Sequence, residues 1–274
     1  MTNSIIKRGI EVFNEEGLFV FGKKAIKYIM RKSLATMRPL LPKKGFQTYN
    51  TVKMGRARLG DSLLNQRTRP EMEDGIVSGH KKYTQQGDSV VIIGGGNGVT
   101  AVRSAKIVGS GGEVIVFEGG EESVERCEKV IDMNEVGDIC TVNYAIVGQE
   151  RNVYGGSTTG AEIVTPSDLP ECDVLEIDAE GAEIDIINEL EDLPEVIIFE
   201  LHPWLYSESP EKPIELLEGM GYEMQYHSGH DGIEISQEEF DLLLQKSRDE
   251  SNEKRGHVES GARWPVVAGG RLTS

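Results

Sequence analysis

A glycine-rich segment follows a short apolar run near the middle of the chain. The run covers Ser89–Ile93, and glycines stand at 94, 96 and 98 before a helical pattern begins. Glycines at a strand-to-helix turn let the backbone approach a bound ligand, which the first N–H groups of the helix then face. We therefore expect Gly94, Gly96 and Gly98 to form a nucleotide-binding turn. The alternative is an ordinary tight turn between a strand and a helix.

The spacing of these glycines distinguishes three types of turn. The dinucleotide fingerprint G-x-G-x-x-G requires a glycine where this chain has Val99, and the Gly-Lys-Ser/Thr of a P-loop is absent. The pattern G-x-G-x-G fits. Glu118 ends a second apolar run 22 residues after Gly96, where a carboxylate can accept hydrogen bonds from both hydroxyls of a ribose. A solvated strand end is the alternative for Glu118, and its distance from the glycines favours ribose binding.

Further groups suited to chemistry stand at the ends of later apolar runs. They are Asp178, Glu180, Glu183, Glu200 and His202. Ligands bind at the carboxyl ends of parallel strands, so side chains there are placed to act on them. His202 has an ordinary pKa suited to a general base, and its alternative is a capping or core histidine. Asp178, Glu180 and Glu183 offer oxygen ligands for Mg²⁺, although the two glutamates could instead favour a helix N-terminus through its dipole.

The elements that must position these groups alternate between strand and helix. Continuous apolar runs indicate buried strands at 89–93, 113–118, 140–147, 173–178, 195–201 and 222–227. Helical patterns cover about 99–108, 121–134, 182–191, 211–219 and 237–247. This alternation predicts a doubly wound, mostly parallel α/β sheet. Residues 264–268 could add a closing strand, which Pro265 favours at an edge. Residues 59–86 look mostly helical, and a short strand is expected at 48–52.

Five segments resemble a known enzyme family. They are VVIIGGGNG at 90–98, VIVFEGG at 114–120, MNEVGDICTVNYAIVG at 133–148, DVLEIDAEGAE at 173–183 and IIFELHP at 197–203. From about 69 to 270 the chain resembles class I S-adenosylmethionine-dependent methyltransferases, specifically the FkbM-type family. The resemblance implies a Rossmann-like sheet of seven strands with the last strand antiparallel. It also implies S-adenosylmethionine as cofactor and O-methylation of a sugar, glycan or glycolipid-type acceptor.

The resemblance also implies roles for single residues. These are a methionine cradle at Gly94, Gly96 and Gly98, ribose binding at Glu118, adenine contact at Ala145 and Ile146, and a place beside the methyl donor for Asp178. Glu71 and Glu73 match an acidic position that the family often uses near the cofactor, or they belong to a surface helix. The family commonly has an acid where this chain has Ile92, and Asp178, Glu180 or Glu73 could compensate.

The first 58 residues lie outside the resemblance and differ in charge from the rest. They contain 13 Lys/Arg and 3 Asp/Glu, and the remainder contains 16 and 43, which gives net charges of +10 and −27. We predict a basic helical extension over 1–58 and a catalytic domain over 59–274. Within residues 1–40, a helix face could lie on an anionic membrane surface or pack on the catalytic body; it contains Leu18, Phe19, Phe21, Ile26 and Ile29.

The composition limits the possible functions. A net charge of −17 does not suit non-specific nucleic-acid binding. Three cysteines without a CxxC pair indicate ordinary thiols of a reducing compartment. No secretory signal or membrane-spanning stretch is visible, so we expect a cytoplasmic protein, with peripheral contact at the inner membrane face as a further possibility. The alternative functions are an NAD(P)-dependent oxidoreductase, which Val99 disfavours, and a non-catalytic methyltransferase-fold binding module, which Ile92 keeps open. His227 and His230 could contact substrate or lie in a solvated loop.

Overall fold

The chain forms two compact units in the computed structural model, which describes residues 26, 28–30, 32–34, 36–59, 61, 68–149, 156–228, 232–253 and 265–272. The first unit draws on Met1–Thr48 and Met54–Arg69, and the second on Tyr49–Lys53 and Pro70–Ser274. The boundary expected after residue 58 stays a prediction. Among the described residues, no helix is both long enough and apolar enough to cross a membrane.

The first unit contains a helical segment and a small sheet. The described residues between 26 and 37 are helical, and the 3-10 helix η1 (Arg38–Leu40), which contains Pro39, ends that segment. β1 (Lys43–Tyr49) lies between β2 (Val52–Arg58) and β3 (Thr68–Arg69). The single strand predicted at 48–52 is wrong, because Asn50 and Thr51 have φ values of 42° and 68° and form the turn between β1 and β2. The apolar residues 18–21 lie outside the described part.

The tip of this hairpin belongs to the second unit. Oδ1 of Asn134 accepts a hydrogen bond from the Lys53 backbone N–H at 3.0 Å, and Nδ2 of Asn134 donates to the Lys53 carbonyl at 2.9 Å. Asn50 Nδ2 donates to Asp74 Oδ1 at 2.7 Å, and Val52 is fully buried. These bonds satisfy polar groups that burial would otherwise leave without partners. The tip is therefore part of the packed body.

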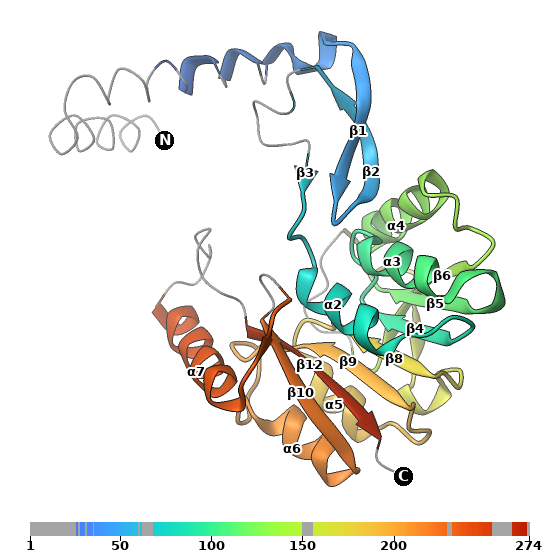
Figure 1. The fold of residues 1–274 in the computed structure, drawn as a ribbon, viewed down its shortest axis with the longest axis vertical. Helices are drawn as coiled ribbons and strands as arrows, with labels where there is room; N and C mark the ends of the chain where they lie inside the picture. Colours follow the sequence, from blue (N-terminus) through green and yellow to red (C-terminus); the bar gives the residue numbers. More distant parts are fainter. Residues whose placement is uncertain are drawn as a thin grey trace, which may run out of the picture. The chain divides into compact units, whose positions relative to one another are not determined.

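The second unit is built on a nine-stranded sheet (Figure 1). Its strands are β4 (Ser89–Ile93), β5 (Glu113–Glu118), β6 (Cys140–Val147), β7 (Glu162–Val164), β8 (Val174–Ile177), β9 (Val196–Glu200), β10 (Tyr222–Ser228), β11 (Glu234–Ile235) and β12 (Pro265–Leu272). They lie in the order β11-β10-β12-β9-β8-β4-β5-β6-β7. β12 is antiparallel to both of its neighbours, and all pairs from β9 to β7 are parallel. Without the short outer strands β7 and β11, this is the expected seven-stranded methyltransferase sheet with an antiparallel last strand.

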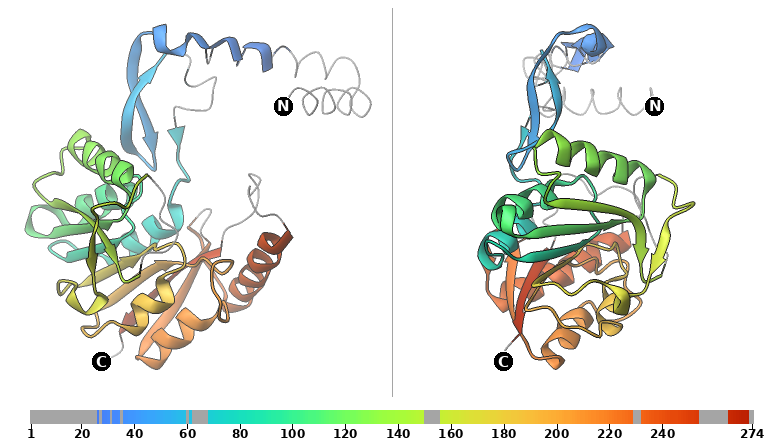
Figure 2. Two further views of the ribbon diagram at one scale, coloured as in Figure 1. Left: turned by 180° about the vertical axis from the view of Figure 1, so that it is seen from behind. Right: turned by 90° about the vertical axis from the view of Figure 1, so that its right-hand side faces the viewer.

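Helices cover both faces of this sheet (Figure 2). They are α2 (Asp74–Tyr83), α3 (Val99–Val108), α4 (Glu121–Met133), α5 (Glu183–Asn188), α6 (Lys212–Gly219) and α7 (Gln237–Glu253). The first three cover one face, and the last three pack on the other through one core cluster that includes Phe199, Leu217 and Phe240. The α/β doubly wound fold is thereby confirmed.

Three predictions about these elements are wrong. Within 59–86, α2 is the one α-helix among the described residues, and residues 68–73 and 84–86 are not helical. α7 continues to Glu253, beyond the end predicted at about residue 247. β12 lies inside the sheet and not at its edge. Pro265 is tolerated there because it is the first residue of the strand, beside a register shift between His227 and Ser228.

Candidate functional site

The glycine turn after β4 is held against the ends of two neighbouring strands. The N–H of Gly94 donates to the carbonyl of Phe117 on β5 at 2.9 Å. Gly94 has a φ of 93°, and a Cβ placed on it would lie 1.9 Å from the carbonyl oxygen of Asp178 after β8. Gly98, with a φ of 74°, precedes α3, and a Cβ there would lie 3.2 Å from Cys127. Position 94 requires glycine, because its positive φ is unfavourable for other residues and the Asp178 backbone leaves no room for a Cβ atom.

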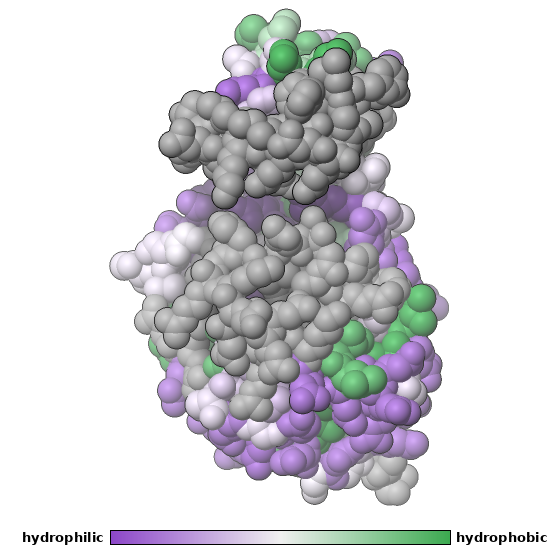
Figure 3. Space-filling model, turned by 90° about the vertical axis from the view of Figure 1, so that its left-hand side faces the viewer, coloured by the Kyte–Doolittle hydropathy of each residue, from purple (hydrophilic) through white to green (hydrophobic). Residues whose placement is uncertain are grey.

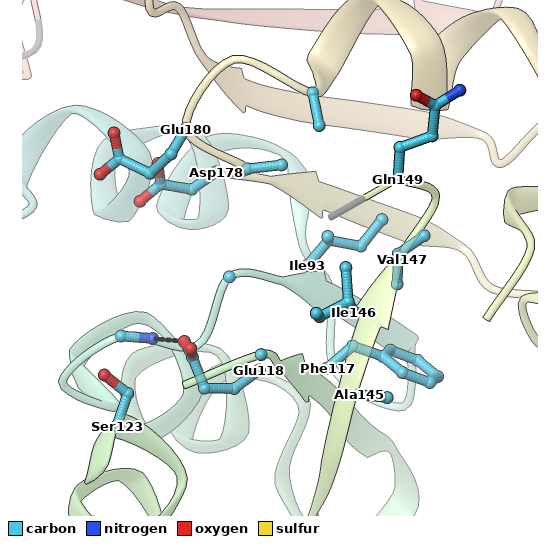
Figure 4. A pocket seen from close by; sticks show the side chains of 15 residues that line it. Ile93, Phe117, Glu118, Ser123, Ala145, Ile146, Val147, Gln149, Asp178 and Glu180 are labelled. Atoms are coloured by element: carbon cyan, nitrogen blue, oxygen red, sulfur yellow. Dashed lines mark hydrogen bonds between the residues drawn. The ribbon is translucent and has the colours of Figure 1, made fainter. Parts of the chain in front are cut away.

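A cavity of about 130 Å³ lies beside this turn. Seven of the predicted cofactor and catalytic residues line it, namely Gly94, Gly96, Glu118, Ala145, Ile146, Asp178 and Glu180. Gly98, Glu73 and His202, all described, are not among its lining residues. Figure 4 shows carboxylates at one end of the cavity and the apolar side chains of β4, β5 and β6 at the other. The cavity therefore has one anionic and one apolar end.

Glu118 is fixed by backbone N–H groups at the wall of this cavity. Its Oε2 accepts a hydrogen bond from Gly96 at 2.7 Å (Figure 4), and its Oε1 accepts one from Gly120 at 2.8 Å. Burial raises the pKa of Glu118, and these N–H groups oppose that rise. Each carboxylate oxygen can accept more than one hydrogen bond, so the fixed carboxylate can still bind two hydroxyls.

His202 lies at the centre of a group of carboxylates that the ends of β8 and β9 bring together. Its Nδ1 lies 2.8 Å from Glu183 Oε1, which also accepts the N–H of Gly181 at 3.1 Å. Its Nε2 lies 3.4 Å from Glu180 Oε2 and 3.6 Å from Asp178 Oδ1. The side chains of Glu183 and His202 are almost completely buried. Glu183 therefore fixes the imidazole so that Nε2 faces the two carboxylates of the cavity.

Burial and charge set the pKa values in this group. Burial alone would lower the pKa of His202, but its hydrogen bond to Glu183 and the nearby carboxylates raise it to about 10. In this arrangement His202 carries a proton at neutral pH, which does not favour the general-base role that its ordinary pKa suggested. Burial and neighbouring negative charges also raise the pKa values of four carboxyl groups, those of Asp178, Glu180, Glu200 and Glu73, the last to about 8.

Two overlapping sets of these side chains could hold a metal ion. One consists of Asp178, Glu180 and His202, and the other of Glu73, Asp178 and Glu200. Within each set, the candidate ligand atoms all lie within 4.8 Å of one another. Hard cations such as Mg²⁺ prefer oxygen ligands, which dominate both sets. Glu183, predicted as an oxygen ligand, instead accepts a hydrogen bond from His202. Carboxylates commonly orient metal-binding histidines in this way.

The residue at the family's usual acidic position, Ile92, is fully buried. Glu176 on β8 lies in register with Ile92, and its Oε2 is 2.6 Å from Nε2 of the buried His80. Glu176 does not line the cavity, so it does not replace the missing acid there. Of the three substitutes considered from the sequence, Asp178 and Glu180 line the cavity and Glu73 does not.

The remaining candidate residues do not line the cavity. Glu71 is exposed before α2, and Glu73 has a φ of 59° at the start of that helix. His227 lies inside β10 and is 3% exposed, so its placement in a loop is wrong. Neither of its ring nitrogens has a hydrogen-bond partner in the described part of the chain. His230 lies outside the described residues.

Some residues of the site were not predicted. The cavity wall also includes Ile93, Phe117, Ser123, Val147 and Gln149. Phe117 and Val147 are next to the predicted residues Glu118 and Ile146 in the sequence, so their position at strand ends could have identified them. The hydroxyl of Tyr206 accepts a hydrogen bond from the His202 backbone N–H at 3.0 Å, and no motif marks it in the sequence.

Comparison with known proteins finds only distant likeness. No family model and no curated protein matches the chain. Similar solved structures include an S-adenosylmethionine-dependent O-methyltransferase from Thermotoga maritima, a precorrin-6y C5,15-methyltransferase from Geobacter metallireducens and an O-methyltransferase from Bacillus cereus in complex with SAH. Their identities are 13%, 15% and 13%, with TM-scores of 0.44, 0.44 and 0.42. The matches cover 73%, 75% and 72% of this chain and 65%, 89% and 80% of theirs. The likeness concerns the fold, which the strand order already establishes.

The contact of Gly94 with Asp178 gives a first prediction. Gly94→Ala should lower the stability by about 3 kcal/mol or more, because a strained φ is combined with a clash against backbone. Gly87→Ala is the matched control, since Gly87 has a φ of 94° and nothing lies within 4 Å of its Cβ position. Urea unfolding should show a loss of only about 1–2 kcal/mol for the control. Equal losses of stability in Gly94→Ala and Gly87→Ala would show that the contact with Asp178 adds nothing to the cost of the Gly94 substitution.

The pKa of His202 gives a second prediction. A histidine whose pKa is raised to about 10 stabilises the fold fully below about pH 6.5, and this stabilisation is lost as the pH rises towards 10. The stability difference between wild type and His202→Gln, measured by urea unfolding in EDTA, should therefore shrink over that range. His227→Gln is the control, because burial lowers the pKa of His227. The stability difference between wild type and His227→Gln should therefore change only at lower pH, where it should shrink as the pH falls. A His202 difference independent of pH would contradict this assignment.

Proposed function

We propose that the chain is an S-adenosylmethionine-dependent O-methyltransferase of the FkbM type, acting on a hydroxyl of a sugar, glycan or glycolipid-type acceptor. The observation that carries the proposal is a single cavity at the carboxyl ends of β4, β5 and β8. Its wall combines the glycine turn, the fixed carboxylate of Glu118 and the carboxylate of Asp178. The acceptor class follows from the sequence resemblance.

The two ends of the cavity suit the two kinds of group in the cofactor. Glu118, Ala145 and Ile146 line the cavity; Glu118 would bind the ribose hydroxyls, and the other two would make apolar contact with the adenine. Asp178 and Glu180 would attract the positive sulfonium and ammonium groups. A dinucleotide carries a negative diphosphate, and none of the described residues that line the cavity is Lys or Arg. The charge therefore favours S-adenosylmethionine over NAD(P).

The residues around His202 would remove the proton from the acceptor hydroxyl. When bound, the cofactor supplies an electrophilic methyl group, and its transfer to a hydroxyl releases one proton. Asp178 and Glu180 line the cavity, so they are placed to touch the acceptor and receive that proton. His202 already carries a proton and lies behind them, which suits a positioning role.

A divalent cation fits the same residues. Asp178, Glu180 and His202, or Glu73, Asp178 and Glu200, would hold it through a predominantly oxygen donor set. A cation there would acidify the acceptor hydroxyl and reduce repulsion among the carboxylates. We propose Mg²⁺ as the ion, because the sets contain no cysteine.

Cofactor binding gives a third prediction. S-Adenosylhomocysteine should raise the melting temperature of the wild type, and Glu118→Ala should bind it about tenfold to a hundredfold more weakly, since charged hydrogen bonds are lost. Glu113→Ala, at the exposed opposite end of β5, should bind like the wild type. Thermal-shift titrations with S-adenosylhomocysteine and with NADH, in dilute buffer and at high salt, make the measurement.

The outcomes of this titration separate the alternatives. Stabilisation by NADH alone would overturn the proposal in favour of an oxidoreductase. Stabilisation by neither ligand would favour a non-catalytic binding module. An unchanged affinity in Glu118→Ala would remove Glu118 from the cofactor site.

Metal binding gives a fourth prediction. Mg²⁺ should raise the melting temperature of EDTA-treated wild type, because binding to the folded state stabilises it. Asp178 belongs to both candidate sets, so Asp178→Asn should abolish most of this effect. Asp192→Asn, at an exposed position after α5, is the matched control and should keep it. The same rise in Asp178→Asn as in the wild type would exclude a metal at this site.

A further inference from the structure

The helical segment of the first unit has a stripe of exposed apolar side chains. Exposed apolar residues are visible in green at the top of Figure 3. Ile26, Ile29, Met30 and Met37 are 61%, 62%, 60% and 54% exposed, and Leu40 in η1 is 84% exposed. At 3.6 residues per turn, the first four fall within an arc of about 100°. Such a stripe usually packs against a core, but here it has no cover among the described residues.

The stripe lies in a segment that is basic throughout. From Gly17 to Gly60 the sequence contains eleven Lys/Arg and no Asp/Glu. In the described part, Lys32, Lys43 and Lys44 are exposed, and they form no ion pair with any other described residue. These cations are therefore available to an anionic surface outside the chain.

Other cations of this unit fix the end of the helical segment. Arg38 Nε donates to Asp61 Oδ1 at 2.7 Å, and the Arg58 backbone N–H donates to Asp61 Oδ2 at 2.7 Å. Nη1 of Arg58 also donates to the carbonyls of Pro39 and Leu41, each at 2.8 Å. Asp61 is completely buried, and its hydrogen bond with Arg38 lowers its pKa. The unit thereby holds η1 and the hairpin as one local structure.

We propose that the exposed face formed by Ile26, Ile29, Met30, Met37 and Leu40, with Lys32, Lys43 and Lys44, docks on an anionic phospholipid surface. An interfacial helix buries its apolar side at the boundary of headgroups and acyl chains, while its cations attract acidic lipids. A nucleic acid would engage the cations but leave the stripe in water. A second copy of the chain would cover the stripe but bring two basic surfaces together. A lipid surface meets both requirements, and it does so independently of the proposed methyl transfer.

The fifth prediction concerns binding of the full chain to vesicles. The wild type should sediment with vesicles containing about one third phosphatidylserine and not with pure phosphatidylcholine vesicles, and added salt should weaken the binding. Replacing Ile26, Ile29 and Met30 by Ser should remove most of it. Lys43→Glu with Lys44→Glu should weaken it by at least about fivefold for each lysine.

Matched variants in the second unit separate this face from general surface effects. Ile163, Ile233 and Leu242 are 59%, 61% and 62% exposed, so replacing these three by Ser removes a comparable amount of apolar surface. Lys81→Glu with Lys129→Glu makes the same change in net charge. Both controls should sediment like the wild type, with circular dichroism confirming that every variant is folded.

Several results would overturn the proposal. They are no sedimentation of the wild type with the anionic vesicles, equal binding to neutral vesicles, and an equal loss in the control variants. Binding to a DNA duplex without binding to vesicles would assign the face to nucleic acid. Self-association in analytical ultracentrifugation that the triple Ser variant abolishes, again without vesicle binding, would assign it to a second copy.

Discussion

The close approach of Gly94 to the backbone of Asp178 is the constraint on which the site depends. Gly94 donates to Phe117 on one side and leaves room for Asp178 on the other, and the Asp178 N–H donates to the carbonyl of Ile93 at 2.8 Å. Three strand ends are thereby tied together at one residue. Because Glu118 follows Phe117 directly, the same contact sets the spacing between its carboxylate and that of Asp178.

The site also concentrates more negative charge than its surroundings neutralise. Several carboxylates with raised pKa values share a single imidazole, and Glu183 uses that imidazole's Nδ1. Glu73 and Glu180 moreover adopt left-handed backbone conformations, with φ values of 59° and 47°. Such conformations cost energy in a non-glycine residue and tend to occur where function requires them. An arrangement of this kind favours a positively charged ligand over a neutral or negative one.

Those parts of the site that depend on short stretches of sequence could be predicted. Buried parallel strands have continuous apolar sequences, so β4, β5 and β6 were predicted with their observed bounds. The candidate residues at the ends of these strands could therefore be identified as well. Contacts between distant residues left no such signal. His202 and Glu183 are 19 residues apart and His80 and Glu176 are 96 apart, so the pKa of His202 and the buried pair emerged only from the fold. β1 was missed because its sequence, KKGFQTY, is largely polar.

The hairpin of β1 and β2 has a consequence for how this protein could have evolved. Its tip is bonded to Asn134 and Asp74 of the second unit, whereas the rest of it belongs to the first. A recombination event at any point between Lys43 and Asn134 would therefore divide the hairpin or separate its tip from at least one of these partners. The hairpin and the second unit are therefore expected to be inherited together, with Asn50 and its partner Asp74 changing together across lineages.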